Sequence, residues 1–509
     1  MGQPLALHSG YRQDNINLFN SKRTQGKKGE LLLCYTLMDK IKPHDPVSLA
    51  FDRGTLLLKG LKCADLSGII SASIWKWDSR VGACRCDAIH YAQVHKTLND
   101  KFEALFSDGV TKPVDITWPK IELPKLRPEQ SEALEAWIQT GCRGQIIMPT
   151  GTGKTEIALE AMAKTMAATL VVAPVRDLMY QWHRRILKAF GYDAGIVGDN
   201  LFNIKPVTVT TYDSAYIHMA KIGAGFSLLI FDEEHHLPGK CYREAAILSA
   251  ATMRLGLTAT PDRSDGLHKD LDWLIGPVAY QMPFKQAKGS TLADFDIVRI
   301  PVALNDREQA TYDQCSRVIQ QFIVSRRKTL PGYIWQDLCR ESGKEPQARQ
   351  AQKAYYLKEA IESRASEKLR VLEDIFRLHK GEKILVFAGS NMMAIEVSQR
   401  FLVPTILSHT RKRERLAVLE GFEKGLFEVL VANRVLDEGI DVPEAKVAVV
   451  IGGQASTRQA KQRLGRILRR SGNARAILYE VVCENTKEVH RSRKRRKSDA
   501  YERTLYRRL

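Results

Sequence analysis

Residues 148–162 read MPTGTGKTEIALEAM, and this stretch decides the fold because a short apolar run precedes it and a helical pattern follows it. Gly151, Gly153, Lys154 and Thr155 have the pattern that ends a phosphate-binding loop. Glycines let backbone N–H groups approach phosphate oxygens, and the N-terminus of the following helix favours their negative charge. The general pattern has glycine where this chain has Met148. A turn that binds no nucleotide is the alternative, but strand, loop and helix stand in the order of a nucleotide site.

Two side chains of this loop would have defined roles toward a nucleoside triphosphate. Lys154 would pair with the β- and γ-phosphates, and Thr155 would hold Mg²⁺. We expect a strand at 144–148 and a helix at 156–166 on either side of the loop. The loop alone does not identify a function, since kinases, transporters, switches and motors share it.

Composition limits the class of protein. The chain has 509 residues, of which 44% are hydrophobic, so several cores can form. No apolar run of about 18 residues predicts a membrane span, and MGQPLALHSG lacks a secretion signal. Nine scattered cysteines suit a reducing compartment. Cys84, Cys86 and His90 lack a second zinc-like pair, so we interpret these cysteines as buried thiols. We expect a soluble protein of the cytoplasm or nucleoid.

The chain is strongly basic, with a formal net charge of +19. Residues 487–509 contribute +7 of this charge, and the remainder of the chain is also basic. A basic body together with a basic tail favours a polyanionic partner such as nucleic acid. A solvated or targeting tail is the alternative, and RKRRK alone does not decide between them.

Short apolar runs alternate with helical patterns from residue 125 onward, which predicts parallel sheets covered on both faces. The first set of predicted strands comprises 144–148, 169–173, 207–210, 228–231 and 254–257. The alternation restarts at residue 383, where the runs are ILVFA, PTILS, VLVAN, VAVVI and ARAILYEVV. Ligands of such sheets bind at the carboxyl ends of the strands.

These patterns predict an α/β fold in five parts. The parts are a small mixed N-terminal domain (1–124), a first parallel-sheet domain (125–303), a helical insertion (304–378), a second parallel-sheet domain (379–486) and a basic tail (487–509). The insertion is rich in Gln, Arg, Lys and Glu, and Leu330-Pro331-Gly332 predicts a turn within it.

An acidic pair follows the strand LLIF in the sequence FDEEHH, residues 231–236. Asp232 would position Mg²⁺, and Glu233 would orient and deprotonate an attacking water. A solvated acidic turn is the alternative, which the buried strand and the upstream loop disfavour. Thr258 and Thr260 in the run GLTATP suit a relay from the nucleotide to a second site, although this run alone carries little information.

The second sheet carries VLDEGIDVP at 435–443 and QRLGRILR at 462–469. Arg466 and Arg469 are three residues apart, so on a helix they share one face. Two convergent guanidinium groups suit the charge that develops on a transferring phosphate. A basic helix that contacts nucleic-acid phosphates is the alternative.

At this point the five motifs, in this order and spacing, resemble superfamily-2 helicases over residues 125–482. The resemblance implies two RecA-like domains, an ATP and Mg²⁺ requirement, and arginine fingers at Arg466 and Arg469. It implies that Arg127 and Gln130, in LRPEQ, recognise adenine. It also explains Met148, since the family's loop usually reads PTGxGKT. Further implied nucleotide contacts are Gly151, Thr152, Gly153, Lys154, Thr155, Gly439 and Asp441.

Within that superfamily the chain is most similar to XPB-type DNA helicases, through DEEHH and through TATPDRSDG at 258–266. The family's Arg-Glu-Asp element reads Arg263-Ser264-Asp265 here, which puts strand separation in doubt more than ATP hydrolysis. The region 307–364 takes the place of the family's thumb-like insertion. Residues 73–91 resemble a domain that engages distorted DNA. The residues implied in DNA contact or coupling are His235, Thr258, Thr260, Arg263, Asp265, Gln462, Trp75 and Trp77.

The leading hypothesis is therefore an ATP-dependent DNA helicase or translocase, 3′→5′ by resemblance, acting in excision repair or transcription-associated DNA opening. One alternative is a duplex translocase that remodels DNA without unwinding it. Another is an ATP-gated clamp that holds DNA for a partner nuclease. An RNA helicase is disfavoured by the flanking segments. We expect a monomer that binds DNA and, where incision occurs, relies on a partner.

Overall fold

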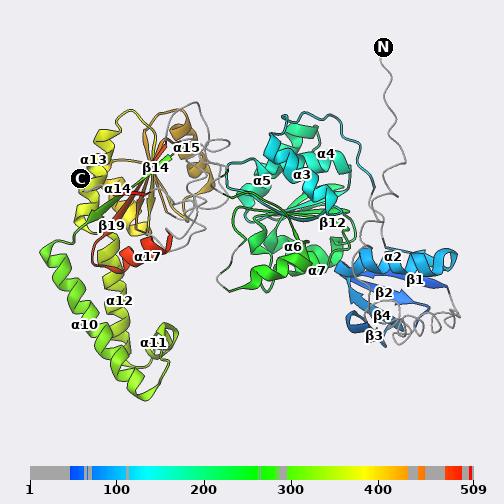
Figure 1. The fold of residues 1–509 in the computed structure, drawn as a ribbon, viewed down its shortest axis with the longest axis horizontal. Coiled ribbons are helices and arrows are strands. Elements are labelled where there is room, and N and C mark those ends of the chain that lie inside the picture. Colours follow the sequence, from blue (N-terminus) through cyan, green and yellow to red (C-terminus); the bar gives the residue numbers. More distant parts are fainter. Residues whose placement is uncertain are drawn as a thin grey trace, which may run out of the picture. The chain divides into compact units, whose positions relative to one another are not determined.

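The computed structural model describes residues 46–506, except for 62–65, 67–71, 111–113, 262, 264, 284–285, 287–294, 434–444, 453–475 and 496–503. The described residues form one five-stranded, one eight-stranded and one seven-stranded sheet (Figure 1). The predicted fold class is confirmed: a small mixed N-terminal sheet precedes two parallel-sheet domains. None of the described helices is both long and apolar enough to cross a membrane.

The N-terminal sheet has the strand order β3-β4-β2-β1-β5. Its strands are β1 (Val47–Asp52), β2 (Thr55–Lys59), β3 (Lys76–Asp78), β4 (Ala83–Asp87) and β5 (Phe106–Asp108). Alternate apolar residues of β1 and β2 are buried, as a half-buried sheet requires. Helix α2 (Tyr91–Phe102) buries Val94, Leu98 and Phe102, which a spacing of four residues places on one face.

The cysteines of β4 differ from the prediction at one position. Cys86 is a buried thiol, as expected. Cys84 takes part in a disulfide, so its interpretation as a buried thiol is wrong. The pattern C-x-C could not reveal this bond, because disulfide pairing depends on the folded domain and not on local spacing. The described residues contain no group of His, Cys, Asp and Glu arranged to hold a metal ion.

The first large sheet has the strand order β13-β6-β12-β11-β7-β10-β8-β9 and is parallel except for β9. Its strands are β6 (Arg143–Ile147), β7 (Thr169–Ala173), β8 (Gly195–Gly198), β9 (Leu201–Asn203), β10 (Val207–Thr211), β11 (Leu228–Asp232), β12 (Met253–Thr258) and β13 (Val278–Gln281). The five predicted strands of this domain are confirmed to within two residues at each end. The sequence analysis missed β8, β9 and β13, which are short and lie toward the sheet edges.

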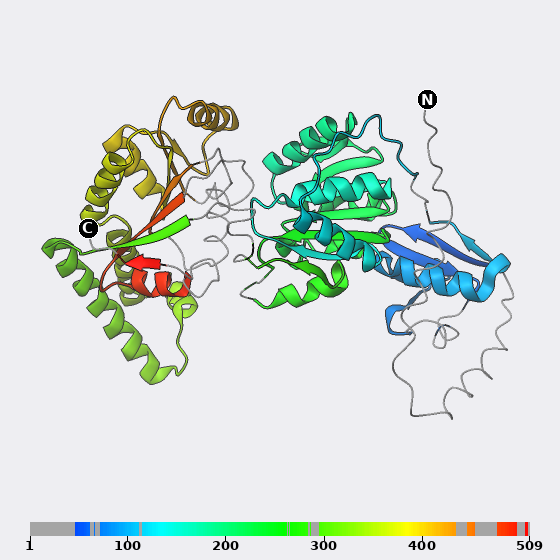
Figure 2. The ribbon, with the colours of Figure 1, turned by 45° about the horizontal axis from the view of Figure 1, so that its top comes forward.

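Helices cover both faces of this sheet, as Figures 1 and 2 show. They are α3 (Pro128–Gln139), α4 (Lys154–Thr165), α5 (Arg176–Phe190), α6 (Tyr212–Ile222), α7 (Glu244–Ile247) and α8 (Leu271–Leu274). Apolar residues of α3, α4 and α5 pack in one core, and those of α6, α7 and α8 pack in another. The strands supply alternate residues to the two cores, which explains why β7 is buried throughout its length.

The second large sheet has the order β16-β17-β15-β18-β19-β14-β20, and each neighbouring pair is parallel. Its strands are β14 (Phe295–Val302), β15 (Ile384–Ala388), β16 (Thr405–Ile406), β17 (Val429–Ala432), β18 (Val447–Ile451), β19 (Ala476–Cys483) and β20 (Thr504–Tyr506). The helices α13 (Ser366–Leu378), α14 (Asn391–Phe401), α15 (Lys412–Glu423) and α17 (Lys487–Arg495) accompany it. The five predicted strands of this domain are present.

Three elements pair or pack across the predicted domain boundaries. β14 falls in the predicted first domain, but it pairs with β19 in the second sheet over its whole length. α13 falls in the predicted insertion, but its apolar face belongs to the second sheet's core. The predicted tail begins with α17, where Glu488 and Ser492 are buried. Each difference arises from contacts between segments far apart in the sequence, which local patterns do not show.

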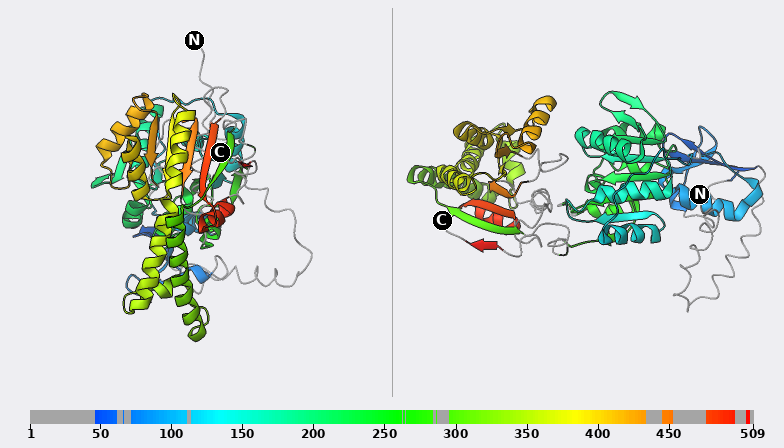
Figure 3. Two further views of the ribbon diagram at one scale, coloured as in Figure 1. Left: turned by 90° about the vertical axis from the view of Figure 1, so that its left-hand side faces the viewer. Right: turned by 90° about the horizontal axis from the view of Figure 1, so that it is seen from above.

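The insertion itself consists of α10 (Asp306–Thr329), α11 (Trp335–Glu341) and α12 (Pro346–Ser363). The long helices α10 and α12 lie side by side, as Figure 3 shows. The predicted turn is confirmed, since α10 ends at Thr329 and Gly332 has a φ of +98°. A small apolar core that includes Phe322, Tyr333 and Leu338 joins α11 to the pair.

The β8–β9 hairpin generates a stability prediction. A Cβ atom at Gly195 would lie 2.5 Å from the carbonyl oxygen of Asn203 and 2.8 Å from the backbone nitrogen of Lys205. Because these are backbone atoms, Gly195→Ala should lower the free energy of unfolding by about 1–3 kcal/mol. The control Gly343→Ala meets its nearest atom at 3.6 Å and should change stability little. Calorimetric melting of both variants checks this, and equal melting temperatures would contradict it.

Candidate nucleotide-hydrolysis site

The loop between β6 and α4 requires its glycines. Gly151 and Gly153 have φ values of +87° and +80°, in the left-handed region that favours glycine. A Cβ atom on Gly153 would also lie 2.4 Å from the side-chain nitrogen of Gln130. Met148, which stands where the general pattern has glycine, is fully buried and packs in the core beneath the loop. The loop therefore departs from the general pattern at a position that serves packing.

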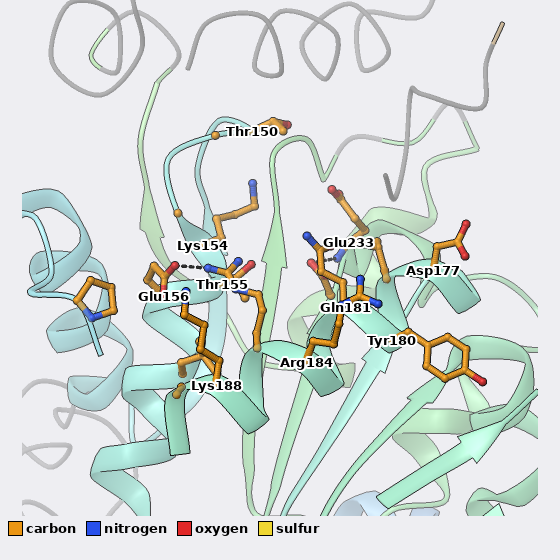
Figure 4. A pocket seen from close by; sticks show the side chains of 18 of the residues that line it. Thr150, Lys154, Thr155, Glu156, Asp177, Tyr180, Gln181, Arg184, Lys188 and Glu233 are labelled. Atoms are coloured by element: carbon orange, nitrogen blue, oxygen red, sulfur yellow. Dashed lines mark hydrogen bonds and ion pairs between the residues drawn. The ribbon is translucent and has the colours of Figure 1, made fainter. Parts of the chain in front are cut away.

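The polar groups of this loop face a cavity and fit a triphosphate. Thr150, Lys154 and Thr155 line the cavity together with both loop glycines (Figure 4). The Lys154 ammonium donates to the carbonyl oxygens of Met148 and Pro149, at 3.0 and 3.3 Å. The Thr150 hydroxyl is buried and has no hydrogen-bond partner in the described part of the chain. Phosphate oxygens would supply acceptors for these donors.

The pair predicted to recognise adenine lies at the start of α3 and contacts the loop backbone. Gln130 is buried, and its side-chain nitrogen donates to the carbonyl oxygen of Thr152 at 2.8 Å. The guanidinium of Arg127 donates to the same oxygen, and the Arg127 backbone N–H donates to the Gln130 side chain at 2.8 Å. Both side chains thus hold the phosphate loop in place. Their contact with adenine stays a prediction.

Asp232 ends β11 and is held from two directions. Its carboxylate accepts a hydrogen bond from the indole N–H of Trp182, on α5, at 2.8 Å. Its backbone oxygen accepts one from the Tyr212 hydroxyl, on α6, at 3.0 Å. Burial raises the pKa of Asp232, while the Trp182 hydrogen bond and the positive charge of Lys154 act in the opposite sense. A carboxylate fixed in this way fits the predicted role of Mg²⁺ ligand.

Glu233 follows directly and has a strained backbone. Its φ of +49° lies in the left-handed region, which non-glycine residues rarely adopt. Strain of this kind is concentrated at functional sites, where the surrounding structure imposes it. Glu233 also lines the cavity with Asp232 (Figure 4). The structure therefore brings the predicted catalytic carboxylates and the phosphate loop around one cavity.

A chain of contacts leads from Glu233 to the end of β12. The Nδ1 atom of His235 lies 3.4 Å from a Glu233 carboxylate oxygen and 3.1 Å from the Thr258 hydroxyl oxygen. The Thr258 hydroxyl oxygen accepts a hydrogen bond from the Thr260 backbone N–H at 3.1 Å. His235 and Thr258 are fully buried. The sequence pattern around Thr258 and Thr260 carried little information by itself, but in the structure these residues connect directly to the acidic motif through His235.

Arg263 continues this line from the other side of His235. Its guanidinium donates to the His235 carbonyl oxygen at 2.7 Å and makes two hydrogen bonds with Asp265, at 3.0 and 2.6 Å. These bonds lower the pKa of Asp265 to about 2. The two remaining members of the Arg-Ser-Asp triplet are therefore paired, and the arginine is tied to the acidic motif.

The other predicted residues have different outcomes. Trp77 is 55% exposed on β3, which suits a binding residue. Trp75 is 6% exposed and belongs to the core, so little of its side chain is available for the predicted contact with DNA. The remaining predicted residues lie outside the described residues; they are Gly439, Asp441, Gln462, Arg466 and Arg469.

Sequence reasoning missed three residues around the acidic motif. Trp182 and Tyr212 belong to helices whose sequences show only amphipathic spacing, so no signal pointed to their bonds with Asp232. Glu234 lies in the acidic motif, but the sequence predicts no separate role for it. It is fully buried, its carboxyl oxygens have no hydrogen-bond partner among the described residues, and burial raises its pKa well above the ordinary range. A Cβ atom on Gly256 would overlap this carboxyl group, at 1.6 Å.

A phosphate loop and an acidic strand end on one parallel sheet, followed by a second parallel sheet, are the arrangement found in helicase-class nucleotide-hydrolysing enzymes. Three family descriptions match parts of the chain. Residues 49–104 match the Xeroderma pigmentosum group B helicase damage recognition domain, and residues 123–263 match the Type III restriction enzyme, res subunit. Residues 334–499 match the ERCC3/RAD25/XPB C-terminal helicase.

Individual relatives agree with these matches. The DNA 3′-5′ translocase XPB2 of Sulfurisphaera tokodaii is 39% identical over 424 residues, which are 83% of this chain and 95% of that protein. The DNA 3′-5′ helicase XPB of Kineococcus radiotolerans is 32% identical over 387 residues, which are 72% of this chain and 62% of that protein. The chain belongs to the XPB family of helicases and translocases. The structure of S. cerevisiae Dbp5 bound to RNA and ADP BeF3 shares the fold, with a TM-score of 0.52 at 15% identity, over 76% of this chain and 90% of that chain.

The bond between Trp182 and Asp232 generates a prediction about Mg²⁺. Trp182→Phe keeps an aromatic ring in place but removes the indole donor. Loss of a hydrogen-bond partner behind a metal ligand typically costs 10–100-fold in metal affinity or activity. We therefore expect the Mg²⁺ concentration for half-maximal ATP hydrolysis to rise about tenfold.

The control is Trp137→Phe, which removes a buried indole bond to the Arg254 carbonyl oxygen, 2.9 Å long, outside this site. It should leave the Mg²⁺ requirement unchanged. Titration of Mg²⁺ against the hydrolysis rate measures both variants. The same Mg²⁺ requirement in the two would contradict the role of Trp182.

The unpartnered carboxyl group of Glu234 generates a stability prediction. A buried polar group without a partner costs about 1–3 kcal/mol. Glu234→Met replaces it with an unbranched apolar side chain and should raise the free energy of unfolding by about that amount. Glu234→Gln keeps a buried polar group and should gain less. Denaturant unfolding monitored by circular dichroism ranks the two variants, and a Met variant less stable than the Gln variant would refute the assignment.

Proposed function

We propose that this chain is an ATP- and Mg²⁺-dependent DNA helicase or translocase that moves 3′→5′ and opens DNA in repair or transcription. The observation that carries the proposal is the buried chain of contacts from Glu233 through His235 to Thr258. It links Glu233, whose carboxylate would act on water, to the end of β12, and the guanidinium of Arg263 is bonded to the same His235. The activities named for the relatives support the direction of movement and the choice of DNA.

The residues around the cavity would divide the hydrolytic work. Backbone N–H groups of the loop and the Lys154 ammonium would bind the phosphates, and Thr155 and Asp232 would hold Mg²⁺. Bound Mg²⁺ supplies positive charge that stabilises the transferring phosphate. Glu233 would orient and deprotonate the attacking water. Trp182 and Tyr212 would keep Asp232 in position throughout the cycle.

The second sheet would complete the site. By family resemblance, Arg466 and Arg469 would stabilise charge on the transferring phosphate, and Gln462, Gly439 and Asp441 would contact nucleotide or transmit its state. Closure around ATP and reopening after product release would then alter the grip on DNA once per cycle.

His235 would report the nucleotide state to the DNA-binding side of the first sheet. A shift of Glu233 during hydrolysis alters its contact with His235, whose carbonyl oxygen is bonded to Arg263. Arg263 is also paired with Asp265, so the two would move together. Buried polar chains of this kind transmit small displacements because each member is held by its neighbours.

The grip on DNA would rest on charge and on exposed aromatic surface. The net charge of +19 favours contact with phosphates, which needs no sequence recognition. In the N-terminal sheet, Trp77 of β3 pairs in register with Cys84 of β4, and its side chain is 55% exposed. An exposed indole suits stacking on unpaired or distorted bases.

A duplex remodeller that does not separate strands is the second candidate. It is favoured by Ser264, which stands where the family element has a carboxylate. Under either candidate, incision of DNA would need a partner nuclease. We propose that the protein works inside the cell as a monomer, in contact with DNA and with such a partner.

The first test is ATP hydrolysis by the wild type beside Lys154→Ala, without nucleic acid and with single-stranded, duplex or forked DNA or RNA. We expect DNA to stimulate hydrolysis strongly. Lys154→Ala should abolish turnover, because it removes charge stabilisation at the transferring phosphate. Rates that are equal with and without DNA would overturn the proposal and indicate a partner-gated switch.

The two N-terminal tryptophans give a matched pair for DNA binding. Trp77→Ala should leave the melting temperature and the basal ATPase unchanged but weaken the preference for distorted over regular duplex DNA, by about 1–3 kcal/mol for one lost stacking contact. Trp75→Ala should instead lower stability by about 3–5 kcal/mol, as loss of a core aromatic does. Fluorescence anisotropy and thermal melting separate the two effects. An unchanged preference in Trp77→Ala would sink that role.

A further inference from the structure

The base of the helical insertion holds charged side chains that are almost completely buried. Lys368 of α13 is 0% exposed, Glu488 of α17 is 2% exposed and Glu362 of α12 is 1% exposed. Buried charges are expensive unless they are paired and fully hydrogen-bonded. This cluster lies outside the nucleotide site, and none of its members was singled out by the sequence motifs.

The Lys368 ammonium joins three segments of the chain. It donates to both carboxylate oxygens of Glu488, each at 2.8 Å, and to the backbone oxygen of Glu362 at 2.6 Å. These bonds use all three of its donors. Glu488 also accepts a bond from the backbone N–H of Cys483, at the end of β19, at 2.8 Å. α12, α13, α17 and the second sheet therefore meet at one ion pair.

The Glu362 carboxylate ties α17 to both long helices of the insertion. One of its oxygens accepts bonds from the Tyr312 hydroxyl of α10, at 2.8 Å, and from the Lys487 backbone N–H of α17, at 3.3 Å. The other oxygen pairs with Arg491 of α17. α10 begins the insertion and α12 ends it, so both ends of the insertion are held by α17, a helix that follows the second sheet in sequence.

The charges of this cluster balance, with Lys368 and Arg491 against Glu362 and Glu488. Buried ion pairs of this kind add little stability compared with apolar residues of similar volume. What they can supply is a single arrangement, because their bonds require defined directions. Such bonds would fix the direction of the two helices at the base of the insertion more strictly than apolar packing.

We propose that α17 braces the insertion against the second sheet, so that movement of this sheet in the ATP cycle carries the insertion along as a rigid arm. Lys368, Glu362, Glu488 and Arg491 are then positioning residues that couple hydrolysis to movement along DNA. This inference rests on the proposed function and adds to it a cluster that is not among the described residues lining the nucleotide cavity.

The test replaces the central ion pair with apolar side chains, in Lys368→Met/Glu488→Leu. Removing two buried charges favours stability, whereas the Cys483 N–H and the Glu362 carbonyl oxygen lose a partner, so we expect only a small change in melting temperature, and DNA-stimulated ATP hydrolysis should stay within about twofold. Displacement of a third DNA strand per ATP hydrolysed should fall at least about fivefold, as expected if the arm is no longer held. The control is Glu367→Leu/Arg370→Met, which removes an exposed ion pair from the same helix and should keep full displacement per ATP.

A distance measurement tests the brace directly. Spin labels attached through unnatural ketone side chains at Leu330, at the end of α10, and at Leu402, after α14, report the direction of the arm without involving cysteines. Both positions are exposed. The distance distribution should be narrow in the wild type and in the control and broad in the double variant. Tyr312→Phe removes one hydroxyl from the cluster and should broaden the distance distribution less than the double variant does. This single variant keeps the test usable if the double variant fails to fold.

The outcomes separate this inference from the proposed function. A wild type without DNA-stimulated hydrolysis would refute the proposed function, and the distance distributions alone would then decide whether the brace exists. A DNA-stimulated wild type with equal displacement per ATP and equal distance distributions in all variants would overturn the brace while leaving the function intact.

Discussion

Parallel pairing of β6, β12 and β11 is the constraint on which the hydrolytic site depends. Thr258 pairs in register with Ile147, and Leu257 pairs with Asp232, so the three strands end at the same edge of the sheet. The phosphate loop, the acidic motif and the TATP run follow directly from these ends. Because the strands are parallel and adjacent, segments far apart in the sequence meet within hydrogen-bond distance, and no separate device is needed to assemble them.

The same site shows how polar groups in a core can be costly and useful at once. Glu234 is buried beside Gly256 without a hydrogen-bond partner among the described residues, which is a cost with no visible return in this structure. His235 and Thr258 are equally buried, but they contact each other and Glu233. The cluster around Lys368 is a third case, in which every donor of a buried ammonium is used. Contact geometry, more than burial, separates the groups that could carry a signal from those that only lower stability.

Much of the fold and part of the site follow from sequence patterns. β7, β15 and β18 have the predicted bounds. A fully buried strand is a continuous apolar run, and turn-forming or charged residues mark where such a run ends. The loop and the acidic motif were found because glycine conformation and carboxylate chemistry restrict the residue types at those positions. The family resemblance accounts for Met148 as a departure from the general pattern, and the structure adds that its side chain packs in the core beneath the loop.

What the sequence did not show depends on long-range contacts. β14 pairs with β19, almost two hundred residues later in the chain, and no local pattern reveals this. The sequence pattern does not distinguish Trp75 from Trp77, yet Trp75 follows a turn of 3₁₀ helix and is buried, whereas Trp77 lies on β3 and is exposed. The bond from Trp182 to Asp232 joins a helix to a strand end fifty residues away.

The central claim is that hydrolysis at Glu233 drives movement along DNA, and displacement of a third strand from duplex DNA tests it most directly. The account predicts ATP-dependent displacement by the wild type and none by Glu233→Gln, which should still bind ATP. DNA-stimulated hydrolysis without displacement would contradict it and would show a clamp that consumes ATP without moving.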